Sequence, residues 1–198
     1  MQAEPRPPSS FAIDLPGTLL ARVRAGDRAA FEQVYRWFER PVFTLALRIC
    51  GDRDEAADVL QETMLKVIDR IADFRGDSPF WGWLRQIAVN EALMKLRRNR
   101  RHADELPIDD HFEPADHLSL PPPAAADAAL LVQALAALPA NTRSVLWLYH
   151  AEGYTHEEIA GLMSRTTSFS KSQLARGTRR LRSLLEPESL PAKETAHA

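Results

Sequence analysis

Apolar residues recur at helical spacing through most of this chain, and that period excludes most fold classes. The widest stripe lies in residues 54–71 and consists of Val59, Leu60, Thr63, Met64, Val67, Ile68 and Ile71. Such spacing is typical of an amphipathic helix that covers a core. Shorter stripes recur from residue 18 to 101 and from 127 to 185, and no segment alternates as a half-buried strand does. The sequence therefore predicts an all-α fold.

Turn and cap residues divide these stripes into separate helices. Asp27 follows Gly26 and is a typical N-cap, and Pro41 is expected to open a new helical segment that stops at Gly51. The stretch 76–79, Gly-Asp-Ser-Pro, indicates a turn before another helix. Thr155, with a glutamate three residues later, forms a capping-box pattern.

The charged residues are strongly segregated, although the net charge is only −2. Residues 91–102 carry five basic side chains and one acid, residues 103–127 carry seven acids and no Lys or Arg, and residues 165–182 carry six basic side chains and no acid. Prolines also accumulate in the acidic stretch, which is typical of a linker. We expect two small helical domains, 18–102 and 127–186, joined by a flexible acidic, proline-rich linker, 103–126. Residues 1–17 and 187–198 are expected to be disordered.

Several function classes lack their usual residues. The single cysteine, Cys50, excludes an internal disulfide, and the six histidines are scattered without ligand-like spacing. No glycine-rich phosphate loop or nucleophile–base pattern is present. We therefore predict no enzyme activity, no cofactor and no metal. Because no run approaches about 20 apolar residues and the N-terminus lacks the apolar run of a signal peptide, we expect a cytoplasmic protein without membrane insertion.

Residues 154–182 have the pattern of a helix-turn-helix. A short acidic helix is followed by a turn and by a longer basic helix, a motif that places its second helix in the major groove of DNA. Apolar residues of both helices are expected to pack inward: Ile159, Ala160, Leu162, Met163, Phe169, Leu174, Leu181 and Leu184. The candidates for DNA contact are Arg165, Thr167, Ser168, Lys171, Ser172 and Arg176, since Lys, Arg and Ser bind phosphates and base edges.

Two further surfaces of the first domain are not explained by a plain core. The helix over residues 58–68 is expected to expose Asp58, Gln61, Glu62 and Leu65, a mixed face suited to a protein partner. The segment 74–85 then concentrates four aromatic residues together with two arginines, Arg75 and Arg85, and is followed by the basic run 95–101. Aromatic side chains beside cations are what stacking on unpaired bases requires.

The order of these parts identifies a resemblance. Residues 54–101, DEAADVLQETMLKVIDRIADFRGDSPFWGWLRQIAVNEALMKLRRNRR, resemble region 2 of bacterial sigma factors, and residues 137–185 resemble region 4. Nothing between them resembles region 3, and no region 1.1 precedes them. This layout resembles the extracytoplasmic-function (ECF, group IV) sigma factors, over roughly residues 18–186.

The resemblance implies a role for each candidate residue. The face of Asp58, Gln61, Glu62 and Leu65 matches the stretch that docks on the clamp-helix coiled coil of core RNA polymerase. The recognition helix matches the part that reads the −35 promoter element, through Arg165, Thr167, Ser168, Lys171, Ser172 and Arg176. The loop and helix that melt the −10 element and capture a flipped base correspond to Arg75, Asp77, Ser78, Trp81, Arg85, Asn90, Arg97 and Arg98. The resemblance also implies that the linker threads through the polymerase cleft and that an anti-sigma factor is a partner.

The sequence departs from the family pattern in two places. The helix-turn-helix turn is Ser-Arg-Thr-Thr-Ser-Phe-Ser over 164–170, without the usual glycines, which points to a separate −35 preference. The region 2 loop carries Phe-Trp-Gly-Trp, where Phe-x-Thr-Trp is common, and this bears on how the −10 element is read.

Two other functions compete with the sigma-factor interpretation. A helix-turn-helix regulator that acts on duplex DNA without being a polymerase subunit would explain residues 128–186, but not the aromatic segment or the mixed face of residues 58–65. A sigma mimic that only titrates an anti-sigma factor would be expected to lose its basic DNA-facing residues, and this chain keeps them.

Overall fold

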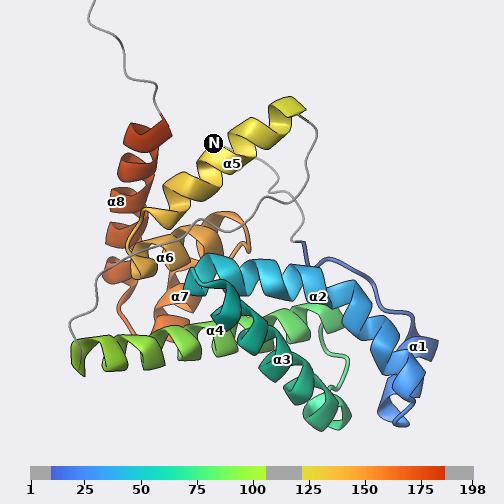
Figure 1. Ribbon diagram of the computed structural model, residues 1–198. Helices are drawn as coiled ribbons and strands as arrows, with labels where there is room; N and C mark the ends of the chain where they lie inside the picture. Colours follow the sequence, from blue (N-terminus) through green and yellow to red (C-terminus); the bar gives the residue numbers. More distant parts are fainter. Residues whose placement is uncertain (1–9, 106–121, 186–198) are drawn as a thin grey trace, which may run out of the picture.

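The computed structural model describes residues 10–105 and 122–185, and every regular element in these ranges is a helix (Figure 1). The predicted all-α class is therefore confirmed. The α-helices are α1 Gly17–Arg24, α2 Arg28–Cys50, α3 Arg53–Arg70, α4 Phe80–Glu105, α5 Pro122–Ala136, α6 Ala140–His150, α7 His156–Met163 and α8 Thr167–Leu185. A single 3₁₀ turn, Ile71–Asp73, follows α3.

Side-chain caps set the starts of α2, α3 and α7. The Asp27 carboxylate accepts hydrogen bonds from the N–H groups of Ala29 and Ala30, at 2.9 and 3.1 Å, and opens α2. Asp52 caps α3 in the same way. At α7, Thr155 and Glu158 form the reciprocal capping box that the sequence predicts. Each cap satisfies N–H groups that the first turn of a helix leaves without an intrahelical partner.

Pro41 does not open a new helix, contrary to the prediction. Helix α2 runs through it for 23 residues and ends only at Gly51, whose φ of 84° gives the left-handed C-cap that was expected. A proline inside a helix removes one backbone hydrogen bond and usually kinks or breaks it. Here Pro41 is itself buried, between Phe38 and Val42 on the core side, and this packing holds the helix together.

Helices α2, α3 and α4 pack against one another and form the core of the first domain, with α1 beside α2 (Figure 1). Their largest fully buried side chains include Phe38, Leu45, Ile49 and Leu84. Phe11 is also fully buried, with Ile13 and Leu15 packed partly against the same core. This short apolar segment, whose composition suggested disorder, therefore contributes side chains to the core.

The second domain consists of α5 to α8, and α8 packs on α6, α7 and α5. Helices α6 and α8 approach closely at Gly177, where a Cβ atom would lie 2.6 Å from Leu146 Cδ1 and from Thr142 Cγ2. Most apolar positions of the predicted helix-turn-helix are buried or half-buried. Leu184, which was expected to pack inward, is 39% exposed because α8 extends beyond the helices that cover it.

The two domains touch. Helix α6 packs against α2, and α7 against α4 (Figure 1). Val145, Leu148, Tyr154 and Ile159 of the second domain belong to the same cluster of buried residues as the first-domain core. Of the predicted linker 103–126, residues 106–121 lie outside the described residues. Its ends do not, since α4 continues to Glu105 and α5 begins at Pro122, and the exact domain bounds stay a prediction.

Candidate nucleic-acid and partner interfaces

The turn of the helix-turn-helix is shorter than the stretch 164–170 that the sequence predicts. Ser164 adopts a left-handed conformation with φ 53° and ends α7, the position where a glycine is most common. The Thr166 hydroxyl then accepts a hydrogen bond from the Phe169 N–H at 3.2 Å, as an N-cap does. Helix α8 therefore starts at Thr167, so Thr167, Ser168 and Phe169 are already part of the recognition helix.

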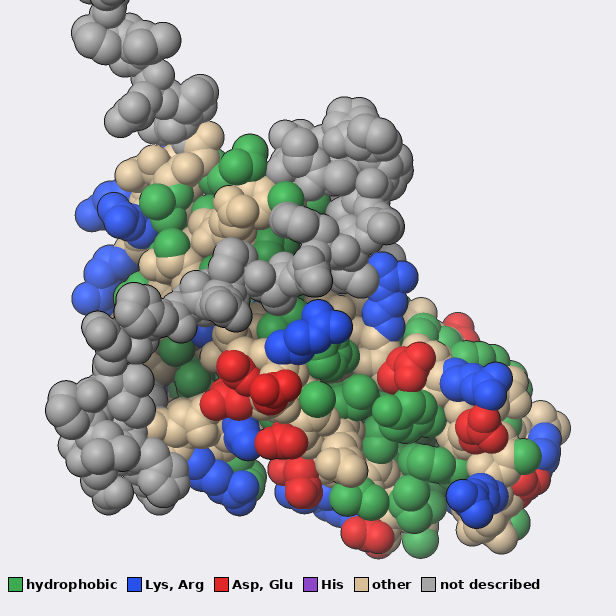
Figure 2. Space-filling view, viewed as in Figure 1, with side chains coloured by type: hydrophobic (Ala, Val, Ile, Leu, Met, Phe, Trp, Pro, Cys, Tyr) green, Lys and Arg blue, Asp and Glu red, His purple; other side chains and the backbone are tan. Residues whose placement is uncertain are grey.

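The front of α8 presents the predicted DNA contacts to solvent. Ser168, Lys171, Ser172 and Arg176 are exposed, whereas Thr167 is half-buried. Two of them are linked, because Arg176 Nη2 donates to Ser172 Oγ at 3.2 Å. Figure 2 shows Lys and Arg side chains along the α8 edge of the molecule. These are the donors that phosphates and the major-groove edges of bases accept.

The rear of α8 anchors this surface. Ser170 is fully buried, and its hydroxyl lies 3.0 Å from Nδ1 of His156, whose ring stacks on Tyr149. Arg165 is exposed and its guanidinium lies over the Phe169 ring, 5.7 Å from the centroid. The structure thus brings the six predicted −35 residues together at the N-terminal half of one helix and the turn before it.

The second predicted surface lies on the outer side of α3. Asp58, Gln61, Glu62 and Leu65 are all exposed, and half of the Leu65 surface is open to solvent. Figure 2 shows acidic side chains beside apolar ones over this helix. A polar groove of about 250 Å³ lies along the contact between α3 and α4. It is lined by Asp58, Val59, Gln61, Glu62, Glu91, Met94, Lys95 and Arg98. Arg98, a predicted DNA contact, therefore lies beside the acidic face.

Most of the aromatic segment belongs to the core. The rings of Phe74, Phe80 and Trp83 lie 5.3 to 5.7 Å apart and hold the turn against α2. Trp81 is half-buried elsewhere on α4, with the Arg85 guanidinium 5.3 Å from its centroid. Trp81 is thus the one of the four aromatic residues that lies outside this cluster, and it lies beside a cation.

The eight residues predicted for the −10 element do not form one continuous surface. Arg75, Asp77 and Ser78 are exposed in the turn before α4. Asn90 is also exposed, but it follows Trp81 by nine residues, about 2.5 helical turns, so the two point to opposite sides of α4. Two further members contact the second domain and not solvent alone: Arg85 and Arg97.

Comparison with known families accounts for both domains. Residues 34–102 match the family model of sigma-70 region 2, and residues 128–181 match that of sigma-70 region 4. The RNA polymerase sigma-H factor of Pseudomonas aeruginosa is 32% identical over 180 residues, covering 85% of this chain and 93% of that protein. The ECF sigma factor SigM of Mycobacterium tuberculosis is 34% identical over 168 residues, covering 84% and 83%.

The chain belongs to the ECF sigma factors.

Two solved structures share this fold. The Bartonella quintana sigma factor RpoE, crystallised with the anti-sigma factor NepR, aligns with a TM-score of 0.60 and 24% identity, over 80% of this chain and 98% of that one. CnrH, solved with the cytosolic domain of CnrY, aligns with a TM-score of 0.51 and 23% identity, over 87% and 97%. At these identities the likeness concerns the fold.

Membership in the family favours the sigma-factor function over a duplex-DNA regulator that is not a polymerase subunit. A sigma factor recognises promoters for RNA polymerase and is not an enzyme. A duplex-DNA regulator that is not a polymerase subunit would have no use for region 2. Within the described residues, no group of three or more metal-ligating side chains is present, and no helix has the length and apolar character needed to cross a membrane.

Sequence reasoning missed three residues of this sigma factor that join its domains: Arg143, Glu152 and Tyr154. All three are buried, with exposed fractions of 7%, 4% and 5%. The guanidinium of Arg143 donates to five backbone carbonyls, and burial lowers its pKa. Burial likewise raises the pKa of the Tyr154 hydroxyl. The only signal in the sequence was a charged residue, Arg143, within the apolar helix pattern of residues 142–148.

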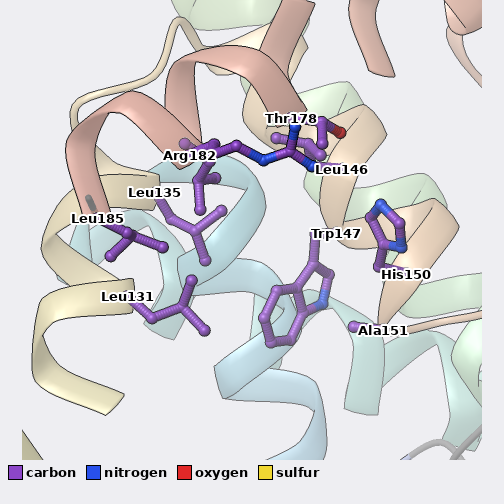
Figure 3. Close-up of a pocket in the computed structure, with 10 residues that line it drawn as sticks. Leu131, Leu135, Leu146, Trp147, His150, Ala151, Thr178, Arg182 and Leu185 are labelled. Carbon is purple, nitrogen blue, oxygen red and sulfur yellow. The ribbon is translucent and has the colours of Figure 1, made fainter. Parts of the chain in front are cut away.

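The second domain also carries an apolar groove of about 650 Å³. Figure 3 shows Leu131 and Leu135 of α5 facing Trp147, with Leu185 of α8 beside them and Arg182 at the rim. Leu131 and Leu185 are each 42% exposed, so this groove is an uncovered apolar surface. Monomers usually keep such surfaces small unless a partner covers them.

Proposed function

We propose that this sigma factor reads the −35 promoter element with the front of α8, through Arg165, Thr167, Ser168, Lys171, Ser172 and Arg176. The observation that carries the proposal is the exposed row of Lys, Ser and Arg on a helix whose rear is anchored in a capped helix-turn-helix. The N-terminal part of such a helix enters the major groove, where bidentate contacts from Arg or Lys distinguish guanine from other bases. Because these basic side chains are exposed, the chain keeps the DNA-facing chemistry that a sigma mimic would lack.

The α3 face is the proposed docking surface for core RNA polymerase. Asp58, Gln61 and Glu62 surround the exposed Leu65, so the partner should offer basic side chains around an apolar contact. Removing a half-exposed leucine from water stabilises the complex by about 25 cal/mol for each Å² of apolar area that the partner buries. The surrounding charges then contribute orientation and association rate more than affinity.

The turn before α4 and the exposed side of that helix are proposed to open the −10 element. Extruding a base costs a few kcal/mol, which a stacking partner must offset. Trp81 supplies an aromatic face, and Arg75 and Arg85 supply nearby positive charge. Asp77, Ser78, Asn90, Arg97 and Arg98 stay candidates for contacts with the melted strand. The acidic linker 103–126 is proposed to thread the polymerase cleft, where its carboxylates would imitate nucleic acid.

The groove of the second domain is the proposed contact for an anti-sigma factor. Its apolar floor fits one face of an amphipathic helix, and Arg182 and His150 at its edge favour a helix flanked by acidic residues. The similar solved structure of RpoE contains an anti-sigma factor, NepR. We place the protein in the cytoplasm, where bacterial RNA polymerase acts.

The experiment that tests the function is transcription in vitro. The purified chain is mixed with bacterial core RNA polymerase and a pool of promoter fragments from the source genome, and the products are sequenced. Discrete start sites preceded by a shared pair of upstream motifs are expected. The absence of both product and binding to core polymerase would refute the proposal. Binding without product would favour a mimic.

A pair of variants then assigns the −35 contacts. Lys171→Ala is expected to weaken binding to duplex −35 DNA and to reduce the slope of log K against log salt by about 1, because one phosphate contact is lost. Arg36→Ala removes an equally basic side chain that is 72% exposed on α2, and it should leave the slope unchanged. Equal slopes for both variants would place the DNA contact away from α8.

A further inference from the structure

Two neighbouring arginines at the end of α2 differ in how their N–H groups are satisfied. The Arg143 guanidinium donates to five backbone carbonyls, among them those of Arg48 at 2.9 Å and Cys50 at 3.2 Å. The Nε of Arg48, in contrast, is buried and has no hydrogen-bond partner among the residues that the structure describes. Arg48 therefore keeps a donor that a ligand could use.

No carboxylate compensates the charge of Arg48. Within the described ranges, no ion pair includes Arg48 or Arg143. Burial lowers the pKa of the Arg48 guanidinium, and no acidic neighbour opposes that shift. Burial, together with the like charge of Arg48, also lowers the pKa of Arg143. A partly buried charge without a counter-ion destabilises the folded chain, so the presence of Arg48 calls for a reason other than stability.

The usual structural role of a basic residue near a helix C-terminus is already filled by Arg143. The last carbonyls of a helix carry partial negative charge, which a cation stabilises. Arg48 lies in the last turn of α2, but the carbonyls of residues 48, 49 and 50 accept hydrogen bonds from Arg143. Gly51 permits this approach, because a Cβ there would lie 2.5 Å from Arg143 Nη2. The helix end is thus complete without the side chain of Arg48.

Arg48 lies at the margin of the apolar groove of the second domain. Its guanidinium carbon is 5.6 Å from the centroid of Trp147, which forms part of the groove (Figure 3). A cavity of about 20 Å³ has Arg48, Arg143 and Val132 among its lining residues, and it adjoins the groove at Leu135, which lines both. This volume is enough for one water-sized atom, such as a carboxylate oxygen.

These surroundings select one ligand chemistry. A guanidinium binds carboxylates and phosphates through charge-assisted hydrogen bonds. The groove beside it exposes Leu131 and Leu185, so the ligand must also bring apolar side chains, which a free phosphate or a small carboxylic acid lacks. An amphipathic helix with an Asp or Glu beside its apolar stripe brings both.

We infer that Arg48 binds a carboxylate of the protein helix that occupies this groove, so that the helix presents apolar side chains to α5 and α8 and an Asp or Glu to the end of α2. The inference rests on the proposed role of the groove as the contact for an anti-sigma factor, and it makes Arg48 a residue that selects the partner. Replacing Arg48 should therefore weaken binding of the partner without lowering the stability of the free chain. A merely structural arginine would not give this combination.

The stability test is urea unfolding of the full-length chain, followed by far-UV circular dichroism. Arg48→Met keeps the aliphatic length and removes the uncompensated charge, so the urea midpoint is expected to be unchanged or higher. Arg143→Met leaves five carbonyls without their donor, so the midpoint is expected to fall. A fall for Arg48→Met as large as that for Arg143→Met would show a structural role and overturn the inference.

The binding test selects peptides on the immobilised full-length chain. A phage-displayed library encodes helices of about 16 residues with leucine at i, i+3, i+4 and i+7 and random residues elsewhere. Peptides selected on the unaltered chain are expected to share Asp or Glu at defined positions beside the leucine stripe. Selection on Arg48→Met should lose the preference at one of these positions, whereas Arg36→Met, the matched control with a 72% exposed arginine of α2, should keep them all. If every acidic preference survives Arg48→Met, or none exists, the inference is wrong.

One selected peptide then measures the pairing itself. The acid that depends on Arg48 is replaced by its amide, and the Kd of both peptides is measured by fluorescence anisotropy. The amide should weaken binding to the unaltered chain about tenfold, because a charge-assisted hydrogen bond is lost. It should change binding to Arg48→Met by less than about twofold, because the partner of the acid is already absent. Equal losses on both chains would place the carboxylate elsewhere and contradict the inference.

Leu131→Asp separates this inference from the proposed role of the groove. Leu131 is 42% exposed on α5, so the variant is expected to fold and to lose binding of the selected peptides. If it loses binding while Arg48→Met keeps every acidic preference, the groove is the contact and the role of Arg48 is wrong. If the peptides bind Leu131→Asp as they bind the unaltered chain, the groove is not the contact, and both proposals fail.

Discussion

The same substitution at two glycines of the helix-turn-helix should change stability in opposite directions. Gly177→Ala places a methyl group 2.6 Å from both Leu146 Cδ1 and Thr142 Cγ2. Thr142 is branched at Cβ, and its hydroxyl is held by a 2.6 Å hydrogen bond to Gln173, so it cannot rotate away freely. Overpacking of this kind lowers the free energy of unfolding by about 1 to 3 kcal/mol. The better helix propensity of alanine raises it by about 1 kcal/mol.

We therefore expect Gly177→Ala to lower the free energy of unfolding by about 1 kcal/mol, the balance of these two effects. Gly161→Ala is the matched control, because Gly161 lies within α7 and a Cβ there would meet no atom within 4 Å. Because only the better helix propensity of alanine applies at this position, Gly161→Ala should raise the free energy of unfolding by up to about 1 kcal/mol. The two variants should thus differ by about 2 kcal/mol, a difference worked from the same two magnitudes.

The assay is urea unfolding of the full-length chain, followed by far-UV circular dichroism, with the slope against urea compared between variants. A shift of the midpoint at constant slope reports stability and not a change in the denatured state. If both variants stabilise the chain equally, the close approach of α6 and α8 at Gly177 is wrong, and so is the placement of the recognition helix that depends on it.

Three further predictions follow from single sites. Thr155→Ala should lower the free energy of unfolding by about 1 kcal/mol in the same urea assay, because the capping box of α7 loses its hydroxyl; no loss would show that the cap contributes nothing to stability. Leu65→Asp should abolish binding to core RNA polymerase in a pull-down while −35 duplex binding persists, and loss of both would indicate misfolding. Burial raises the pKa of the Cys50 thiol from 9.0 to about 12. The folded chain then keeps a proton that the unfolded chain releases above about pH 9, so stability should fall between pH 9 and 12, and less steeply in Cys50→Ala.

Features that depend on neighbours in the sequence were predictable. The N-cap at Asp27, the capping box at Thr155 and the C-cap at Gly51 are local, because each joins atoms a few residues apart. The exposed face of α3 could be predicted for the same reason: helical periodicity decides which side chains share a side. Family resemblance then connected these local patterns to a function that the comparisons confirm.

Features that depend on distant partners were not predictable in this way. Pro41 lies inside a helix because the core around Phe38 and Val42 compensates for the lost hydrogen bond, and nothing in the local sequence shows that core. Phe11 is buried because it reaches the same core from a segment whose composition suggested disorder. In both cases burial among residues far along the chain outweighs the local preference.

By itself, the sequence determined the helices, their caps and the chemistry of the three surfaces, since helix period and capping act over one or two turns. Only the tertiary structure decided which of those surfaces are free. Arg85 has the residue type and position expected of a DNA contact, yet it is held by Glu152 and Tyr154 of the other domain. The residues that meet at that boundary are 67 positions apart in the sequence, and their contact depends on packing that no local pattern encodes.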